Sequence, residues 1–327
     1  MIRGARILVT GGAGMVGSHI VDAVLARGAR EVRVLDNFSR GVTRHLDTAL
    51  ESGRAACWDA DLRDTDAVRA ACTDVDLVFH QAAMRVTRCA AEPDNAFTSM
   101  AQGAWNLFSA AANAGVQKIV AASSGVIYGA TEEVPTPETQ NPYADTTMYG
   151  ACKVFEEQLL RFLSANAAMD YAILRYANVY GPRCALQRDA EVLVRWMEAI
   201  EAGDPIQIDG DGAQTADFVA VTDAVRANVL AALSPDQALC CNVGTGVETS
   251  VRQLAEALMR AMGREVPIVH TPPRAVNAVP RRALDGTHAE QVLGFRPYTP
   301  LDVGLQQLVD WWRAVSPTPA FISEGVV

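Results

Sequence analysis

The stretch "GGAGMVG", residues 11–17, lies between a short apolar run and a longer helical pattern. The run "RILVT" precedes it at 6–10, and the helical pattern after it extends to about residue 27. Its glycines Gly11, Gly14 and Gly17 are three residues apart, which lets the chain turn tightly and lets a helix pack close to a strand. This stretch therefore predicts a strand, a sharp turn and a helix in immediate succession.

The alternation of strand and helix continues through the first half of the chain. Further apolar runs stand at 31–36, 55–62, 76–83 and 118–124, with helical patterns between them. Strands separated by helices imply right-handed crossovers and a parallel sheet that is covered on both faces. We therefore predict the α/β class, with a doubly wound parallel sheet of the Rossmann type.

An acidic residue ends the second predicted strand. Asp36 follows the glycines by about 20 residues, where a carboxylate can accept hydrogen bonds from the ribose hydroxyls of adenosine. The free amides at the start of the first helix would face a pyrophosphate. Together these features predict a dinucleotide site, and the negative charge of Asp36 favours NAD over NADP. Arg40 keeps NADP open, because an arginine there could bind a 2′-phosphate.

Composition excludes several classes of partner. The 327 residues are 50% hydrophobic and carry a formal net charge of −10, without a basic run that would attract nucleic acid or an anionic membrane. The chain has no leader pattern and no apolar stretch long enough to span a bilayer, so we expect a cytoplasmic protein. Its seven cysteines contain no Cys-x-x-Cys, and its histidines lack ligand spacing, so we expect no metal site.

A tyrosine and a lysine four residues apart follow the dinucleotide pattern. Residues at this spacing share one helix face, so Lys153 would stand beside Tyr149 and stabilise its phenolate. The pKa of an ordinary tyrosine is near ~10, so a neighbouring ammonium and a positive nicotinamide ring are needed to make it a useful base. Ser124, at the end of a predicted strand, would hold the substrate oxygen. An isolated pair of this kind is usually a surface contact, but here it follows a cofactor site.

These motifs resemble, in the same order, those of the extended short-chain dehydrogenase/reductases, and specifically the nucleotide-sugar epimerase/dehydratase family. The resemblance continues through "IDGDGAQTADFVAVTDAV" at 208–225 and "VLGFRP" at 292–297, and so covers nearly the whole chain. The motifs that carry it are Gly11-x-x-Gly14-x-x-Gly17, Asp36, Asp61-Leu62, the run 80–83, Ser124, Tyr149-x-x-x-Lys153 and the run 175–181.

The resemblance implies a role for each matching residue. The catalytic residues would be Ser124, Tyr149 and Lys153. The substrate would be a nucleotide-diphospho-sugar, bound by Arg85, Ser124, Asn178 and Arg274. The residues expected to bind NAD are Gly11, Gly14, Met15, Val16, Gly17, Asp36, Asn37, Ser39, Arg40, Asp61, Leu62, Gln81, Ala82, Ala83, Ser123, Tyr149, Lys153 and Tyr176.

The two residues after Ser124 bear on the reaction. Family members that eliminate water carry an acidic pair there, and decarboxylating members commonly carry a glutamate, whereas this chain has Gly125 and Val126. Neither side chain can exchange a proton, which favours epimerisation at C4 by reversible hydride transfer through a 4-keto intermediate. The alternatives are a 4,6-dehydratase, a decarboxylase, an oxidoreductase on a related sugar or cyclitol, or a non-enzymatic NAD-sensing protein.

The pattern divides the chain into two parts. We expect an NAD-binding domain at 1–178 and 218–246, and a smaller C-terminal α/β substrate-binding lobe at 179–217 and 247–327. Helical patterns are predicted near 147–166, 187–202, 250–262, 287–293 and 301–315. Apolar stripes on the helices near 94–113 and 147–166 match those that form a dimer interface in the family, so a homodimer is expected.

Three positions depart from the family pattern. Ala216 stands where relatives carry an arginine that binds the diphosphate, and Met100 replaces a usual asparagine. Arg274 is the best match to a second phosphate-binding arginine, although the Gly-Asp that should follow it is missing. We expect either that Arg274, together with a residue such as Arg188 or Arg282, compensates for Ala216, or that the phosphates of the substrate lie differently.

Overall fold

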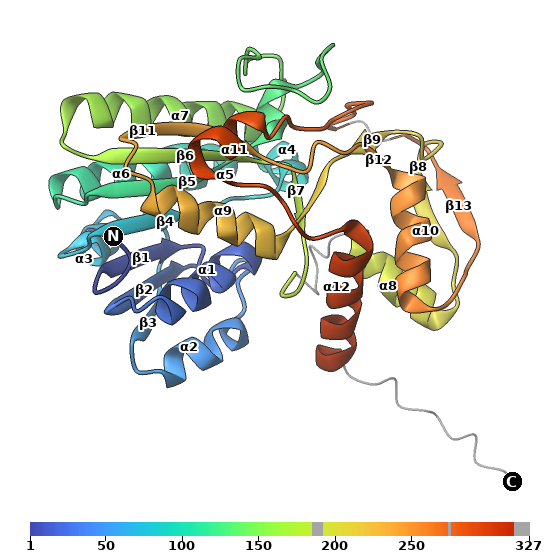
Figure 1. Cartoon of the computed structure of the whole chain (residues 1–327), viewed down its shortest axis with the longest axis horizontal. Coiled ribbons are helices and arrows are strands. Elements are labelled where there is room, and N and C mark those ends of the chain that lie inside the picture. Colours follow the sequence, from blue (N-terminus) through green and yellow to red (C-terminus); the bar gives the residue numbers. More distant parts are fainter. Residues whose placement is uncertain (185–191, 274–275, 317–327) are drawn as a thin grey trace, which may run out of the picture.

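A seven-stranded parallel sheet forms the centre of the computed structural model, which describes residues 1–184, 192–273 and 276–316 (Figure 1). The strand order is β11-β6-β5-β4-β1-β2-β3, and every neighbouring pair is parallel. The strands are β1 (Arg6–Thr10), β2 (Glu31–Asp36), β3 (Ala55–Asp59), β4 (Leu77–His80), β5 (Lys118–Ser124), β6 (Asp170–Tyr176) and β11 (Ala238–Val243). The order reverses between β1 and β4, which confirms the predicted doubly wound sheet and opens a crevice at that point.

Helices pack on both faces of the sheet. Successive residues of β1 point to opposite faces, so Ile7 and Val9 belong to one core cluster and Leu8 to the other. The first face is covered by α1 (Met15–Ala26), α2 (Asp47–Glu51), α9 (Val221–Leu233) and α11 (Thr287–Leu293). The second face is covered by α3 (Thr65–Cys72), α6 (Gly103–Asn113) and α7 (Met148–Asn166).

The turn between β1 and α1 requires glycine at two positions. Gly11 has φ +66°, and a Cβ there would approach the backbone nitrogen of Ala82 to 2.6 Å. A Cβ on Gly17 would collide with the carbonyl of Gly11. The predicted strand, turn and helix are therefore confirmed, with the turn packed directly against the loop after β4.

The predicted helix near 94–113 is interrupted. The chain forms α4 (Val86–Ala91) and α5 (Pro93–Ala96), then a π-helical segment over Phe97–Gln102, and only then α6. This segment brings Met100 into a small buried cluster with Cys89 and Cys152. Met100, which replaces the usual asparagine of the family, is therefore buried among apolar side chains.

A second hydrophobic core lies outside the main sheet. It joins the helices α8 (Val192–Ala202), α10 (Val251–Met262) and α12 (Leu301–Val315) to short strands (Figure 1). Three two-stranded ladders surround it: β7 (Asn178–Tyr180) with β10 (Phe218–Ala220), β9 (Thr215–Ala216) with β12 (Thr249–Ser250), and β8 (Ile206–Asp209) with β13 (Ile268–Thr271). This is the smaller α/β lobe.

The chain returns to the main sheet near its C-terminal end. Ala289 of α11 and the following Phe295 belong to the core cluster on the first face of the sheet, although both fall within the stretch 247–327 expected in the lobe. The division of the chain into domains at the expected boundaries stays a prediction.

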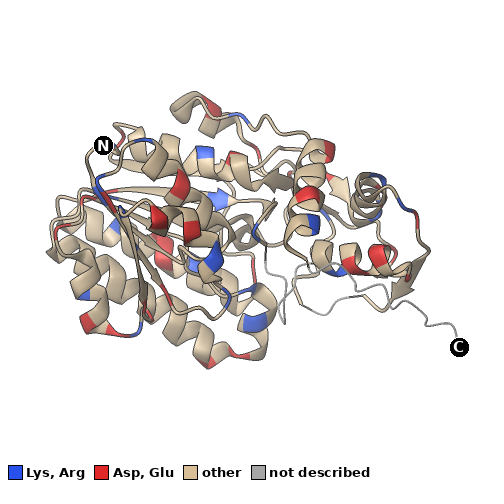
Figure 2. Cartoon of the chain, turned by 90° about the horizontal axis from the view of Figure 1, so that it is seen from below, with Lys and Arg blue, Asp and Glu red and all other residues tan. Residues whose placement is uncertain are grey.

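Acidic and basic residues are interspersed over both parts of the molecule in Figure 2 and do not gather into separate regions by sign. Within the residues that the structure describes, no helix combines the length and the apolar character needed to cross a membrane.

Candidate active site

One cleft, of about 1100 Å³, runs from the glycine turn to the smaller lobe. It opens at the carboxyl ends of the central strands, where ligands bind in sheets of this type. Every predicted site residue that the structure describes lines this cleft. Arg274 lies outside the described residues, as does Arg188. The roles of the lining residues stay predictions, but the structure brings them together.

The glycine turn presents the start of α1 to the cleft. Gly14 caps the helix with an extended backbone, and Met15 and Val16 follow it along the wall of the cleft. The first amides of a helix have no partner inside it, so they are available to an anion. This end of the cleft fits the pyrophosphate of a dinucleotide.

Backbone amides fix the carboxylate of Asp36 at the end of β2. Its Oδ2 accepts a hydrogen bond from the amide of Ala13 at 2.9 Å, and its Oδ1 accepts one from the amide of Phe38 at 2.9 Å. Burial raises the pKa of Asp36, and these two hydrogen bonds oppose that effect. Arg40 lines the same part of the cleft. The carboxylate is thus oriented before any ribose reaches it.

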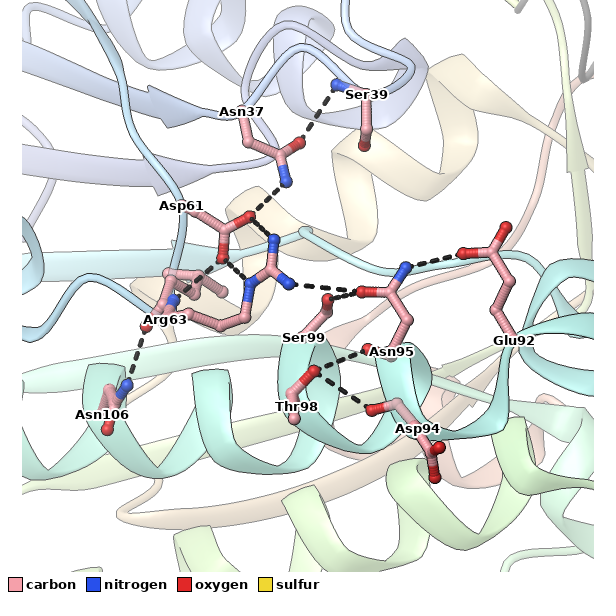
Figure 3. Close-up of polar contacts among 11 residues, drawn as sticks. Asn37, Ser39, Asp61, Arg63, Glu92, Asp94, Asn95, Thr98, Ser99 and Asn106 are labelled. Carbon is pink, nitrogen blue, oxygen red and sulfur yellow. Dashed lines mark hydrogen bonds and ion pairs between the residues drawn. The ribbon is translucent and has the colours of Figure 1, made fainter.

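Asp61 lies at the centre of a polar network on the rim of the cleft (Figure 3). Its Oδ2 accepts a hydrogen bond from Asn37 at 2.7 Å, and Arg63 donates to both of its oxygens at 2.8 Å. The hydrogen bonds from Arg63 lower the pKa of Asp61 to about 2. Arg63 also reaches Asn95, which extends the network to the segment before α6.

Tyr149 and Ser124 are hydrogen-bonded partners in the cleft. Thr147 caps the start of α7 by accepting a hydrogen bond from the amide of Gly150 at 3.0 Å, which positions Tyr149 in the first turn of the helix. Burial raises the pKa of Tyr149, while the ammonium of Lys153 and the hydrogen bond to Ser124 oppose that rise. The arrangement is that of a base whose proton affinity is set by its neighbours.

Two acceptors hold the ammonium of Lys153. Its Nζ donates to the carbonyl oxygen of Ala122 at 2.9 Å and to Oε2 of Glu156 at 2.8 Å. Burial alone would lower the pKa of Lys153, but the charges of Glu156 and Tyr149 outweigh burial and leave that pKa above its ordinary value. An ammonium has three donors, so one remains for a ligand in the cleft.

Glu156 is a functional candidate that the sequence analysis missed. The residue is 3% exposed, and its Oε2 lies 3.9 Å from Nε2 of His80 on β4. Burial raises the pKa of Glu156 to about 7, against the pull of Lys153. Burial also lowers the pKa of His80 to about 3, so the imidazole is neutral beside it. The only sequence signal is an acid three residues after Lys153, on the same helix face.

A second buried network fixes the strand that carries Ser124. Ser123 donates to Oε1 of Glu157 at 2.5 Å, and Arg175 donates to both oxygens of the same carboxylate at 2.9 and 2.6 Å. Arg175 also donates to the hydroxyl of Tyr128 at 2.8 Å. Ser123, expected to bind NAD, therefore has a structural partner between β5 and α7.

Tyr176, which was predicted to lie beside the nicotinamide, is held by a residue that was not predicted. Asn228 of α9 donates to the hydroxyl of Tyr176 at 2.5 Å, and Gln81 donates to the amide oxygen of Asn228 at 3.1 Å. Gln81 and Tyr176 thus form one hydrogen-bonded set with a side chain that lies far away in the sequence.

The substrate end of the cleft combines both parts of the chain. Asn178 begins β7 and is exposed, and Ala216 of β9 pairs with Thr249 of β12 on the opposite wall. Arg85, at the start of α4, also lines the cleft. Arg282 lines it from the loop between β13 and α11.

Known proteins with this arrangement are numerous. The model of the NAD dependent epimerase/dehydratase family matches residues 7–244. The chain is 38% identical over 312 residues to a UDP-glucose 4-epimerase of Mycolicibacterium smegmatis, a match that covers 94% of this chain and 98% of that protein. A solved UDP-glucose 4-epimerase of Thermotoga maritima, with UDP-glucose, matches with a TM-score of 0.89 and 35% identity, over 94% of this chain and 99% of that one.

Other relatives are named for different reactions. A solved dTDP-glucose 4,6-dehydratase of Streptomyces venezuelae, with NAD bound, matches with a TM-score of 0.88 and 28% identity, over 95% of this chain and 97% of that one. Decarboxylases of UDP-sugar acids are 28% and 30% identical to the chain. The matches therefore share a nucleotide-sugar substrate class but not a single reaction.

Proposed function

Because this chain belongs to the NAD-dependent epimerase/dehydratase family, we propose that it epimerises a nucleotide-diphospho-sugar at C4. The observation that carries the proposal is the wall beside Ser124. A Cβ on Gly125 would approach Cδ2 of Leu284 to 2.8 Å, and Val126 is buried. Position 125 has no side chain and packs closely against Leu284, and the next position is apolar, so neither supplies the proton that elimination requires.

The residues present fit the cofactor of the family. The glycine turn leaves no space for side chains where a pyrophosphate would approach, and Asp36 is held in place for a ribose. Lys153 has one donor left for a ligand in the cleft. Bound NAD⁺ would supply the acceptor and the donor of a hydride.

The proposed mechanism assigns one task to each catalytic residue. Tyr149 takes the proton of the sugar's 4-hydroxyl, directly or through Ser124, as the hydride leaves C4. Lys153 stabilises the phenolate by its charge, and Ser124 holds the substrate oxygen. After the 4-keto sugar turns over in the cleft, the hydride returns to the opposite face of C4 and Tyr149 returns the proton to the 4-oxygen, which gives the other epimer. The nucleotide anchors the substrate while the sugar moves, so remote binding energy positions a mobile reacting group.

A homodimer is part of the proposal. Four large apolar side chains on the paired helices are exposed: Phe97 at 55%, Trp105 at 48%, Phe155 at 43% and Phe162 at 56%. Apolar side chains gathered in this way favour a contact with a second protein surface. We infer that this surface, Phe97, Trp105, Phe155 and Phe162, pairs with its copy in a second chain.

A panel of substrates tests the reaction. Purified protein is incubated with UDP-, dTDP- and GDP-sugars without added cofactor, and the products are identified by NMR. Interconversion of C4 epimers is the expected result. Formation of a 4-keto-6-deoxy sugar would favour a dehydratase, and release of carbon dioxide would favour a decarboxylase, the two alternatives that the relatives raise.

A further inference from the structure

Arg282 lines the cleft, and no carboxylate of the described residues lies within ion-pair distance of it. Its Nη2 donates to Oδ1 of Asn277 at 2.9 Å, and its Nε is buried without a hydrogen-bond partner among the described residues. Burial lowers the pKa of Arg282, and only the more distant charge of Asp145 opposes that effect.

Asp145 is already committed to the backbone of α7. Its Oδ2 accepts hydrogen bonds from the amide of Thr147 at 2.9 Å and from its hydroxyl at 2.5 Å. These contacts hold the carboxylate at the start of the helix that carries Tyr149. Arg282 therefore has an electrostatic interaction with Asp145 but no ion pair with it.

Two other arginines of the cleft and the sequence neighbour Arg281 do have ionic partners. Arg63 is bound to Asp61, and Arg183 lies 2.8 Å from the carboxylate of Asp22. Arg281, adjacent in the sequence but absent from the cleft wall, donates to both oxygens of Glu248 at 2.9 and 2.5 Å. The contrast separates Arg282 from arginines whose charge is already balanced within the protein.

The loop that carries Arg282 reaches the reacting end of the cleft. Leu284, two residues further on, packs against Gly125, which follows Ser124. Ala216, where the family resemblance leads us to expect a phosphate-binding arginine, lines the same cleft and has no charge to offer. An anionic group bound in this part of the cleft could therefore form an ion pair with Arg282.

Arg282 is partly buried and its Nε is fully buried without a hydrogen-bond partner among the described residues, which is costly for a charged group, and a ligand anion would reduce that cost. We propose that Arg282 binds an anionic group of the substrate, through the paired donors of its guanidinium. The group is either the diphosphate or the carboxylate of a sugar acid. This inference rests on the proposed nucleotide-sugar substrate.

Binding measurements distinguish the two sources of the anion. Arg282→Gln is compared with the parent chain by calorimetry, with UDP, UDP-glucose and UDP-glucuronic acid as probes. If Arg282 binds the diphosphate, the affinity for all three falls by about ten- to a hundredfold, the range for a lost charge-assisted hydrogen bond. If it binds a carboxylate, only the affinity for UDP-glucuronic acid falls.

Two further variants guard against unspecific effects. Arg281→Gln removes the same charge from the adjacent position and should leave all three affinities within about twofold, because an exposed ion pair contributes little. Arg282→Lys keeps the charge but loses the planar donor pair, so it should show the same pattern with a smaller loss, even where Arg282→Gln does not fold.

Two outcomes overturn the inference in different ways. Unchanged affinity of Arg282→Gln for all three probes, with a parent chain that binds them, would overturn the role of Arg282 alone. A parent chain that binds none of the UDP probes, while dTDP- and GDP-sugars also fail to bind, would overturn the proposed function and the inference together.

Discussion

At the scale of single residues, the proposed base Tyr149 depends on a set of buried charges. Tyr149 contacts Ser124 and lies beside Lys153, and Lys153 in turn is held by Glu156. The spacing of Tyr149 and Lys153 could be recognised in the sequence, because a helix brings residues four apart to one face. The role of Glu156 could not be recognised in the sequence, because an acidic residue on a helix ordinarily faces water. Only the fold places Glu156 against His80 of β4.

Tyr149→Phe should abolish turnover while leaving the fold intact. The change removes the hydroxyl that exchanges the proton, and general base catalysis of this kind contributes about 10²–10⁴-fold. Turnover is measured by NMR, and bound NAD is measured by absorbance after denaturation. Turnover at the parent rate would remove Tyr149 as the base, whereas loss of NAD would indicate that the hydroxyl has a binding role instead.

Glu156→Gln should move the acidic limb of the pH profile. The charge of Glu156 raises the pKa of Tyr149, so its removal lowers that pKa and makes the base active at lower pH. The limb of kcat/KM should shift to lower pH by roughly one unit. Lys153, His80 and Glu157 also face Glu156. The variant keeps these three side chains in place and removes only the negative charge beside them.

Glu156→Asp is the matched control for this shift. It keeps the carboxylate, so its limb should stay closer to that of the parent chain. An acidic limb of Glu156→Gln that coincides with that of the parent would show that the buried carboxylate does not influence the base.

At the scale of elements, the regular helices and strands could be predicted closely. The helices predicted near 147–166, 250–262, 287–293 and 301–315 are observed as α7, α10, α11 and α12, with ends that differ by at most one residue. The helix predicted near 94–113 is split by a π-helical segment. The periodic pattern of apolar residues cannot reveal such a segment, because a single turn with a wider hydrogen-bond spacing hardly changes that pattern.

Gly17→Ala should destabilise the turn between β1 and α1. The added methyl group would collide with the carbonyl of Gly11, so the helix must move away from the strand. We expect a loss of about 1–3 kcal/mol in the free energy of unfolding, together with loss of bound NAD. Thermal unfolding and NAD content are measured side by side.

Gly286→Ala provides the control for that variant. Its nearest neighbour would lie 3.7 Å from the added Cβ, and its φ of −92° suits any residue. Its NAD content should match that of the parent chain. Equal NAD content in Gly17→Ala would contradict the assignment of the turn to the pyrophosphate.

At the scale of the whole molecule, the sheet was predictable, but the inside of the cleft was only partly so. Alternating strands and helices determine a doubly wound sheet, and the crevice follows from its strand order. The hydrogen bonds from Arg63 to Asn95 and from Asn228 to Tyr176 could not be predicted. Each depends on the close approach of elements that are distant in the sequence.

Phe155→Glu should convert the proposed dimer into monomers. A charge within this apolar surface would have to be buried in the interface without a partner. Mass is measured by light scattering after size exclusion. Val303→Glu, at an exposed apolar position on α12, should remain dimeric. A parent chain that is monomeric at micromolar concentration, or a Phe155→Glu variant with the mass of a dimer, would contradict this interface.

The central claim is that hydride leaves C4 and returns to the same carbon without exchange with water. The direct measurement uses a nucleotide sugar that the protein turns over, labelled with deuterium at C4, in the absence of added cofactor. We predict that the C4 epimer forms and keeps its deuterium, as judged by NMR and mass spectrometry. Loss of the label to solvent, or a product that lacks a hydroxyl or a carbon, would contradict the account.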